Sequence, residues 1–357
     1  MQHPTRTLNG LGQSLWLDNI TRSMLGDGTL LGYRDHKTVT GLTSNPTIFA
    51  QAIKAGKDYD ASIRAGGQKD PEAVFFDLAI DDLRRAAAIF EPVYQRTHGV
   101  DGWVSLEVSP LLADDTQGTI EQALVLHKKA AVHNLFIKVP GTPAGIGAIE
   151  ELIFRGVPIN VTLLFSPEQY EAAAEAWLRG LERRHAAGLE LDVASVASVF
   201  ISRWDVKVAD KVPAELHNTL GFAVCERIYA SYRRLLDSPR LQRLQNNGAR
   251  VQRLLWASTG TKDPKASDTL YIEHLAAPLT VNTMPEKTLL AFADHGKAEQ
   301  LMSLNGIDTA SVLAKFQAAG IEVEPLAKVL QKEGADSFVK SWHELLDTVS
   351  QRLEAAA

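Results

Sequence analysis

The sequence predicts an α/β protein that folds as a single (β/α)8 TIM barrel with additional helices, including a C-terminal helical extension. Eight short β-type runs alternate with helical patterns along the 357 residues, and such alternation predicts βαβ units and a parallel sheet. No composition shift, repeat or low-complexity stretch marks an internal boundary. Eight units favour a closed barrel, and an open doubly wound sheet is the structural alternative.

The predicted strands are short apolar runs, as expected for strands that are covered on both faces. They occupy residues 14–18, 38–45, 103–108, 135–139, 159–165, 193–201, 253–258 and 278–283. Between them lie helical patterns, several of which begin at a proline and end near a glycine, for example residues 71–96, 119–133, 145–156 and 167–188. Proline at the start and glycine at the end are typical helix boundaries.

The chain is longer than the roughly 250 residues of a typical barrel, and the excess lies in helical patterns. These patterns fall between the second and third strands, around residues 205–250, and in a tail over residues 309–355. We expect one domain over residues 1–357, with the barrel at about 14–300. The tail reads as amphipathic helices that pack on the outside of the barrel.

Composition excludes several functional classes. The 37 basic and 43 acidic residues give a net charge of −6, without a basic block, so we expect no nucleic-acid or membrane partner. The first residues lack the apolar region of a signal peptide and no run approaches a membrane span, which favours a cytoplasmic protein. The single cysteine, Cys225, excludes an internal disulfide.

Polar residues recur near the carboxyl ends of the predicted strands, where barrels place their active sites. They are Asp18, Asn45, Glu107, Lys138, Asn160, Thr162, Ser198, Arg203, Ser258 and Asn282. Each alone could cap a helix, pair with a neighbouring charge or simply favour a strand. Their recurrence after successive strands predicts an active site.

Lys138 carries the chemical prediction. It interrupts the β-type run "LFIKV", which closes at Val139-Pro140, whereas Lys315 sits among helix formers where its stem can lie along a surface. Removing an ammonium group from water favours its neutral form, and a neutral amine attacks carbonyl carbons. Schiff-base chemistry then needs no metal and no organic cofactor. The alternative is a structural lysine that pairs with Glu107 or Asp18.

The chain resembles the transaldolases, of the longer bacterial type, which belong to the class I Schiff-base aldolase superfamily. The resemblance runs in family order from residue 14 to about 300. Its motifs are "LWLDNI", "GLTSNPTIF", "VSLEVSP", "FIKVPGTPAGIGAIEEL", "GVPINVTLLFSPEQY", "SVASVFISRWD" and "WASTGTKDP".

The resemblance implies a role for four catalytic residues. Lys138 would attack the ketone of a ketose phosphate and form a carbinolamine and then an imine. Glu107 would move the protons for these steps through a water held by Thr162. Asp18 would take the proton of the C4 hydroxyl, which breaks the C3–C4 bond.

The resemblance also implies how the substrates bind. Asn45, Asn160 and Ser198 would hold the hydroxyls of a dihydroxyacetone unit on the lysine. Sedoheptulose 7-phosphate and fructose 6-phosphate are the family's donors in the non-oxidative pentose phosphate pathway, with glyceraldehyde 3-phosphate and erythrose 4-phosphate as acceptors. Arg203 would bind the phosphate. Where shorter relatives have a second arginine, this chain offers Lys262 at a two-residue offset, as the second cation or as a solvated loop lysine.

Two other functions remain open. A fructose 6-phosphate aldolase would use the same lysine, but such aldolases tend to carry tyrosine where this chain has Phe200, and phenylalanine favours transfer. A barrel that binds sugar phosphates without catalysis would need Arg203 but not the catalytic set. The scattered histidines predict no metal, and the glycine-rich residues 141–148 match no nucleotide motif. Homodimers are common in the family, but no pattern in these residues sets the oligomeric state.

Overall fold

The computed structural model describes residues 3–55, 58–65, 67, 70–303 and 309–356. Eight strands form one sheet in the order β2-β1-β8-β7-β6-β5-β4-β3, and every ladder is parallel. The strands are β1 (Gln13–Leu17), β2 (Val39–Leu42), β3 (Val104–Glu107), β4 (Leu135–Pro140), β5 (Ile159–Leu164), β6 (Ser195–Phe200), β7 (Gln252–Ala257) and β8 (Thr280–Met284). Each coincides with a predicted run within a few residues, which confirms the (β/α)8 barrel.

The two end strands of this order, β2 and β3, meet and close the barrel. The Leu42 amide donates to the carbonyl oxygen of Trp103 at 3.0 Å, and the Gly102 amide donates to the carbonyl oxygen of Thr40 at 2.9 Å. Closure leaves the sheet without the unpaired edge that an open doubly wound sheet would expose.

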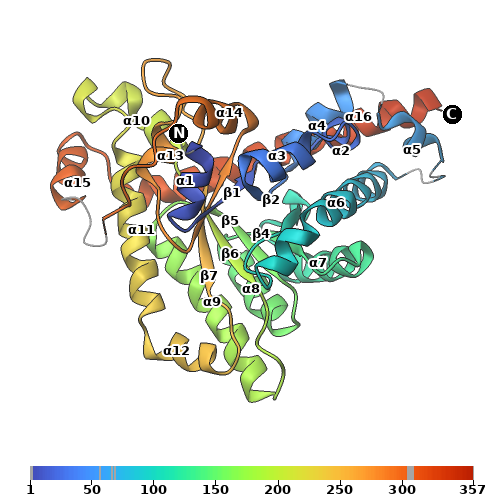
Figure 1. Cartoon of the computed structure of the whole chain (residues 1–357), viewed down its shortest axis with the longest axis horizontal. Coiled ribbons are helices and arrows are strands. Elements are labelled where there is room, and N and C mark those ends of the chain that lie inside the picture. Colours follow the sequence, from blue (N-terminus) through green and yellow to red (C-terminus); the bar gives the residue numbers. More distant parts are fainter. Residues whose placement is uncertain (1–2, 56–57, 66, 68–69, 304–308, 357) are drawn as a thin grey trace.

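Helices surround the strands (Figure 1), and the extra ones lie where the sequence predicts them. They are α1 (Pro4–Gly10), α2 (Arg22–Gly26), α3 (Thr29–Lys37), α4 (Pro46–Ala55), α5 (Asp60–Ala65), α6 (Pro71–Arg96), α7 (Thr116–Ala130), α8 (Pro143–Phe154), α9 (Pro167–Ala186), α10 (Ser202–Val208), α11 (Leu220–Leu236), α12 (Pro239–Asn246), α13 (Leu270–His274), α14 (Glu286–His295), α15 (Thr309–Ala318) and α16 (Val323–Ala356), with short 3-10 turns η1 (Pro110–Leu112), η2 (Ala209–Lys211) and η3 (Ala214–Leu216). Within the described residues, no helix is both long and apolar enough to cross a bilayer.

Side-chain caps fix where the crossover helices begin. Asp70, Asp115, Thr142 and Ser166 each accept a hydrogen bond from a backbone amide in the first turn of α6, α7, α8 and α9. Ser166 and Gln169 form a complete capping box at α9, which satisfies two amide groups that the helix itself cannot pair. Three of these helices also have proline at the first turn, as the sequence patterns predict.

Large side chains fill the amino end of the barrel. The Trp16 indole donates to the Asp101 carboxylate at 2.6 Å, and Arg253 donates to the Ser14 hydroxyl at 2.8 Å. Gly41 allows this packing, because an added Cβ there would lie 2.8 Å from the Trp16 ring and 2.7 Å from the carbonyl oxygen of Trp103. Because these side chains fill the amino end of the barrel interior, we expect a ligand to bind toward the carboxyl ends of the strands.

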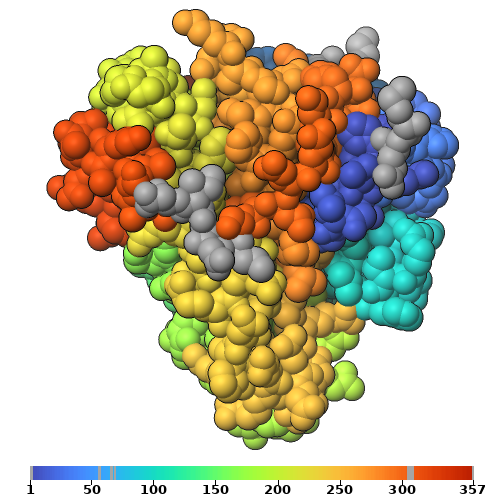
Figure 2. All heavy atoms as spheres, turned by 60° about the vertical axis from the view of Figure 1, so that its left-hand side comes forward, coloured from blue at the N-terminus to red at the C-terminus, as the bar shows by residue number. Residues whose placement is uncertain are grey.

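The C-terminal extension is helical, as predicted, and it packs on outer helices, but α16 also contacts strand β5 and reaches the cavity through Phe338. Near its start α16 lies against β5, and further along it packs on α4, α5 and α6, so that it crosses the molecule toward the C-terminus (Figure 1). There Trp342 meets the Phe75 ring edge-on at 5.1 Å. Helix α15 packs beside α11 on the outer surface, as both Figure 1 and Figure 2 show.

Candidate active site

A cavity of about 120 Å³ lies at the carboxyl ends of the strands. Side chains from β4 to β8, the loops after β1, β2 and β7, and helices α10 and α16 enclose it. The lining residues are Asp18, Thr43, Asn45, Lys138, Thr162, Ser198, Phe200, Arg203, Ala257, Ser258, Thr283 and Phe338. Seven of the ten candidate residues from the sequence are therefore brought together around one cavity.

Lys138 sits between two other candidates in the sheet. On β4 it pairs in register with Glu107 of β3 and with Asn160 of β5. Only 5% of Lys138 is exposed, its Nζ lies 3.3 Å from Glu107 Oε2, and it donates to the carbonyl oxygen of Ser44 at 3.4 Å. The geometry places a buried amine beside a buried carboxylate, at the bottom of the cavity.

Glu107 lies behind Lys138 and is also buried. Burial raises the pKa of its carboxyl, the positive charge of Lys138 opposes that rise, and Asp18 adds to it. Apart from the ion pair with Lys138, its oxygens have no hydrogen-bond partner in the described part of the chain, and the same holds for the Thr162 hydroxyl. These groups have hydrogen-bonding capacity to offer a water or a substrate.

Asp18 directly follows β1, and its backbone amide donates to the carbonyl oxygen of Met284 at 2.7 Å. The Thr43 hydroxyl donates to Asp18 Oδ1 at 2.9 Å and lies 2.8 Å from the Thr283 hydroxyl. Burial raises the pKa of the Asp18 carboxyl, while Lys138, Thr43 and Lys262 partly offset this. A raised pKa makes its carboxylate a stronger base than an ordinary aspartate.

A polar row continues along β5 and β6. The Ser198 hydroxyl donates to Asn160 Oδ1 at 2.6 Å, and Asn160 Nδ2 lies 3.3 Å from the Ser105 hydroxyl. Asn160 stands behind Ser198 and is not itself a lining residue. Asn45 lines the cavity while its Oδ1 accepts from the Ile48 amide at 3.1 Å, so it also caps α4 and keeps its amide nitrogen for a ligand.

Arg203 supplies the positive charge of the cavity. Its guanidinium lies 5.1 Å from the Phe200 ring centroid and 5.9 Å from that of Phe338. Burial lowers its pKa, and Glu333 on α16 opposes this change. In the part of the chain that the structure describes, no acceptor side chain or carbonyl pairs with this guanidinium. Its N–H donors are available to an anion.

Besides Glu107 and Asn160, which lie behind lining residues, two further residues singled out in the sequence do not line the cavity. Lys262 is exposed and does not line it, although its charge is close enough to lower the pKa of Asp18. Asn282 on β8 precedes Thr283, which lines the cavity, so alternation along the strand points Asn282 to the opposite face. The role of Lys262 as a second phosphate ligand therefore remains a prediction. Asn282 is not part of the site.

The structure adds lining residues that sequence reasoning missed. Thr43 bonds to Asp18 and is itself bonded to Thr283, and Thr43 lies inside the motif "GLTSNPTIF", where it could have been noticed. Phe338 comes from α16, nearly 140 positions beyond Arg203 in sequence order, and its ring centroid lies 6.0 Å from Lys138 Nζ. No local pattern distinguishes Phe338 from other apolar residues of an amphipathic helix.

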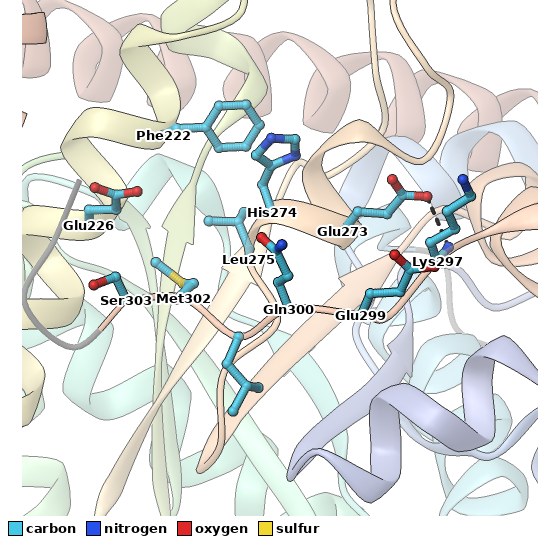
Figure 3. Close-up of a pocket in the computed structure, with 11 residues that line it drawn as sticks. Phe222, Glu226, Glu273, His274, Leu275, Lys297, Glu299, Gln300, Met302 and Ser303 are labelled. Atoms are coloured by element: carbon cyan, nitrogen blue, oxygen red, sulfur yellow. Dashed lines mark hydrogen bonds between the residues drawn. The ribbon is translucent and has the colours of Figure 1, made fainter. Parts of the chain in front are cut away.

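A second hollow lies on the outer surface, beside α11, α13 and residues 297–303 (Figure 3). Its wall includes the carboxylates of Glu226, Glu273 and Glu299, and the Phe222 ring stacks on His274 at 4.4 Å. None of the candidate residues lines it, and its negative charge disfavours a sugar phosphate. Across the described residues, no three His, Cys, Asp or Glu side chains gather in a way that could hold a metal ion.

Comparisons with known proteins agree with this geometry. The family model described as "Transaldolase/Fructose-6-phosphate aldolase" matches residues 15–349. Proteins named "Transaldolase" from Mycobacterium tuberculosis and Saccharopolyspora erythraea are each 42% identical, over 98% of this chain and 97% of theirs. One from Parafrankia sp. is 42% identical over the full length of both chains. The chain belongs to the transaldolase/fructose-6-phosphate aldolase family.

Proposed function

We propose that the chain is a transaldolase that transfers a dihydroxyacetone unit from a ketose phosphate to an aldose phosphate through a Schiff base on Lys138. One observation carries this proposal: the buried Lys138 amine faces Glu107 in a cavity that Asp18 and Arg203 also reach. Relatives named "Transaldolase" that match over nearly the whole chain support the same reaction.

The first step is imine formation at Lys138. Its amine attacks the C2 ketone and a proton moves to the carbonyl oxygen; the carbinolamine hydroxyl then takes up a second proton and leaves as water, which gives the iminium ion. Because burial raises the pKa of Glu107, its carboxyl can carry the proton that these steps exchange. The unpartnered Thr162 hydroxyl would hold the water through which that proton moves.

The second step is cleavage. Asp18 takes the proton of the C4 hydroxyl, the C3–C4 bond breaks, and its electron pair passes to the iminium nitrogen to leave an enamine on Lys138. The aldose phosphate departs. Thr43 donates a hydrogen bond to Asp18 and so orients its carboxylate toward the substrate.

Transfer follows when an acceptor aldehyde takes the place of the product. The enamine attacks the aldehyde, Asp18 returns the proton to the new hydroxyl, and hydrolysis of the imine frees the new ketose phosphate. Between the two half-reactions, the three-carbon unit would be held by Asn45 and Ser198. Asn160 would support it through its hydrogen bond with Ser198. Holding the unit in place makes the second half-reaction effectively unimolecular.

Arg203 would hold the phosphate, because a guanidinium binds phosphate with two parallel hydrogen bonds. Lys262 would add a second, more distant charge. We propose the family's substrates: sedoheptulose 7-phosphate and fructose 6-phosphate as donors, with glyceraldehyde 3-phosphate and erythrose 4-phosphate as acceptors. The setting would be the pentose phosphate pathway in the cytoplasm, where these charged substrates are confined.

The alternative within the family is a fructose 6-phosphate aldolase, because the family description covers both activities. Phe200 lines the cavity and packs beside Phe165, with ring centroids 5.5 Å apart. Its ring has no hydroxyl to position a water for hydrolysis of the intermediate, and this favours transfer.

A pair of coupled assays distinguishes the two activities. Fructose 6-phosphate is supplied with and without erythrose 4-phosphate, and release of glyceraldehyde 3-phosphate is followed. A transaldolase turns over only when the acceptor is present. Fast release without the acceptor would replace the proposal with the aldolase, and no reaction in either assay would favour a barrel that only binds sugar phosphates.

We also propose that residues 1–357 form one domain. Support comes from α16, which packs both on the barrel at β5 and on the extra helices α4, α5 and α6. One cooperative unfolding transition in calorimetry would agree with a single domain, and two separated transitions would not. Light scattering would test the homodimer that is common in the family.

A further inference from the structure

Strand β5 contains an irregularity directly after Thr162. Val161 pairs with Ala197 of β6, and the next pair is Leu164 with Val199. One extra residue is therefore inserted in β5, as in a β-bulge. Leu163 has a φ of 60°, a left-handed conformation that brings its Cβ close to the following carbonyl oxygen and that leucine rarely adopts. Bulges redirect side chains, and this one sits beside a cavity-lining hydroxyl.

Helix α16 holds this bulge through Gln331. The side-chain amide nitrogen of Gln331 donates one hydrogen bond to the carbonyl oxygen of Leu163 and one to that of Gly141, both at 2.9 Å. The Gly141 amide in turn donates to the carbonyl oxygen of Thr162 at 2.7 Å. The loop after β4 and the bulge of β5 are thus joined by one buried primary amide, whose two N–H groups match two carbonyl oxygens.

The same face of α16 approaches the cavity at two further positions. Gly334, one turn after Gln331, permits close approach, because an added Cβ would lie 2.8 Å from a Leu163 methyl and 3.0 Å from the Arg203 guanidinium. Phe338, one turn further, lines the cavity. Residues spaced in this way share one side of a helix. The contact between α16 and the bulge is therefore continuous with the wall of the site.

We propose that Gln331 is a positioning residue, which fixes the strained backbone at Leu163 and thereby aims the Thr162 hydroxyl at the water that serves Lys138. This inference rests on the proposed function, since it assigns Gln331 to the proton transfers of imine formation. Without the two hydrogen bonds, the bulge can relax from its disfavoured conformation and Thr162 loses its fixed direction. Small displacements of positioned groups slow reactions strongly.

A double-mutant cycle tests the proposal. Gln331→Met keeps the length and apolar stem of the side chain but removes both donors, and we expect kcat to fall about tenfold with little change in KM for fructose 6-phosphate. Thr162→Val removes the hydroxyl that Gln331 positions under this proposal. In the Thr162→Val background, Gln331→Met should cause no further loss, because residues that act through one another are non-additive. Equal losses in both backgrounds would overturn the proposal.

The matched control is Gln351→Met, the same chemical change on an exposed residue of the same helix, and it should leave kcat unchanged. Gln331→Glu is the second variant, for use if the methionine variant does not fold. It keeps the shape but places carboxylate oxygens against two carbonyl oxygens, so kcat should fall at least as far. Normal kcat in a folded glutamate variant contradicts the proposal.

Amide hydrogen exchange separates failure of this inference from failure of the proposed function. The Gly141 amide, which is bonded to Thr162, should exchange at least tenfold faster in Gln331→Met than in the parent protein. Unchanged exchange would refute the claim that Gln331 holds the bulge, whatever the enzyme's activity. Faster exchange in Gln331→Met, together with a parent protein that forms no imine, would show that Gln331 holds the bulge but that the proposed function, and with it the role of Gln331 in proton transfer, is wrong.

Discussion

Replacement of Arg203 by glutamine separates phosphate binding from imine chemistry. The Arg203 guanidinium faces the cavity from between Phe200 and Phe338, and among the described residues it has no hydrogen-bond partner. Arg203→Gln therefore breaks no hydrogen bond of the described structure. Burial already lowers the pKa of this group, so loss of the charge relieves an unfavourable desolvation. We expect a melting temperature equal to or slightly above that of the parent.

The effect on binding follows from the hydrogen bonds that the phosphate would lose. A hydrogen bond to a charged group contributes about 1.5–3 kcal/mol, and about 1.4 kcal/mol corresponds to a factor of ten. Even the lower value for one bond gives a loss of about tenfold in kcat/KM, and loss of a two-bond fork gives about a hundredfold. The loss should appear mainly in KM for fructose 6-phosphate.

The assay compares a phosphorylated with an unphosphorylated substrate. Initial rates with fructose 6-phosphate give kcat and KM, while borohydride trapping with dihydroxyacetone reports imine formation at Lys138 without a phosphate. Arg203→Gln should lower kcat/KM for fructose 6-phosphate and leave borohydride trapping of dihydroxyacetone intact. Arg203→Lys should give a kcat/KM between those of the parent and Arg203→Gln, because an ammonium lacks the planar fork. Lys262→Gln, at the more exposed cation, should have the smaller effect.

Two results would contradict the assignment of Arg203 to phosphate binding. The first is a KM for fructose 6-phosphate within twofold of the parent in folded Arg203→Gln. The second is an equal loss of dihydroxyacetone trapping, which would make Arg203 part of the imine chemistry or of the fold.

Other changes give separate tests. Asp18→Asn should lower kcat by about 10²–10⁴, the range for loss of a general base, while borohydride still traps dihydroxyacetone on Lys138. In the parent, kcat/KM should fall as pH decreases, because Asp18 must be ionised to act as the base. Burial raises the pKa of Asp18, so this fall should begin above the ordinary aspartate pKa of 3.8. A pH profile without such a fall would contradict the assignment. An acid whose pKa is raised in the folded state contributes stability below its unfolded pKa, and that contribution is lost as pH rises through its folded pKa. At neutral pH the ionised Asp18 carboxylate therefore lowers the stability of the fold, and Asp18→Asn should raise the melting temperature. Trp342→Ala, which removes the contact of α16 with Phe75, should cost about 3–5 kcal/mol of unfolding free energy in denaturant titrations; a cost below 1 kcal/mol would mean that α16 is weakly held. Phe200→Tyr should increase release of glyceraldehyde 3-phosphate in the absence of an acceptor, and unchanged release would remove Phe200 from the distinction between transfer and cleavage.

The barrel could be predicted because its strands and helices each carry a local signal. Apart from Lys138, the run at residues 135–139 is apolar on both faces, and helices such as α9 begin at a serine followed by a proline. The position of Lys138 also follows locally, since alternation along a strand directs it inward once Val139-Pro140 closes the run. The register that brings Lys138 beside Glu107 is seen only in the structure, in the parallel pairing of β3 and β4.

Other parts of the site depend on tertiary contacts that have no local signal. Leu163 adopts a positive φ that its own preferences oppose, so nothing in "INVTLLF" indicates a bulge. Phe338 and Gln331 belong to a 34-residue helix whose amphipathic pattern shows that one face is buried but not what it covers. Lys262 shows the converse, because a motif suggested a cavity ligand and the side chain lies exposed outside the cavity.

Borohydride reduction in the presence of fructose 6-phosphate, followed by peptide mass analysis, is the sharpest test of whether Lys138 forms the covalent intermediate. If Lys138 carries the intermediate, a reduced three-carbon adduct appears on the peptide that contains Lys138 and is absent in Lys138→Met. An adduct on a different lysine, or none under conditions in which the protein is folded, would contradict the claim that this buried amine forms the covalent intermediate.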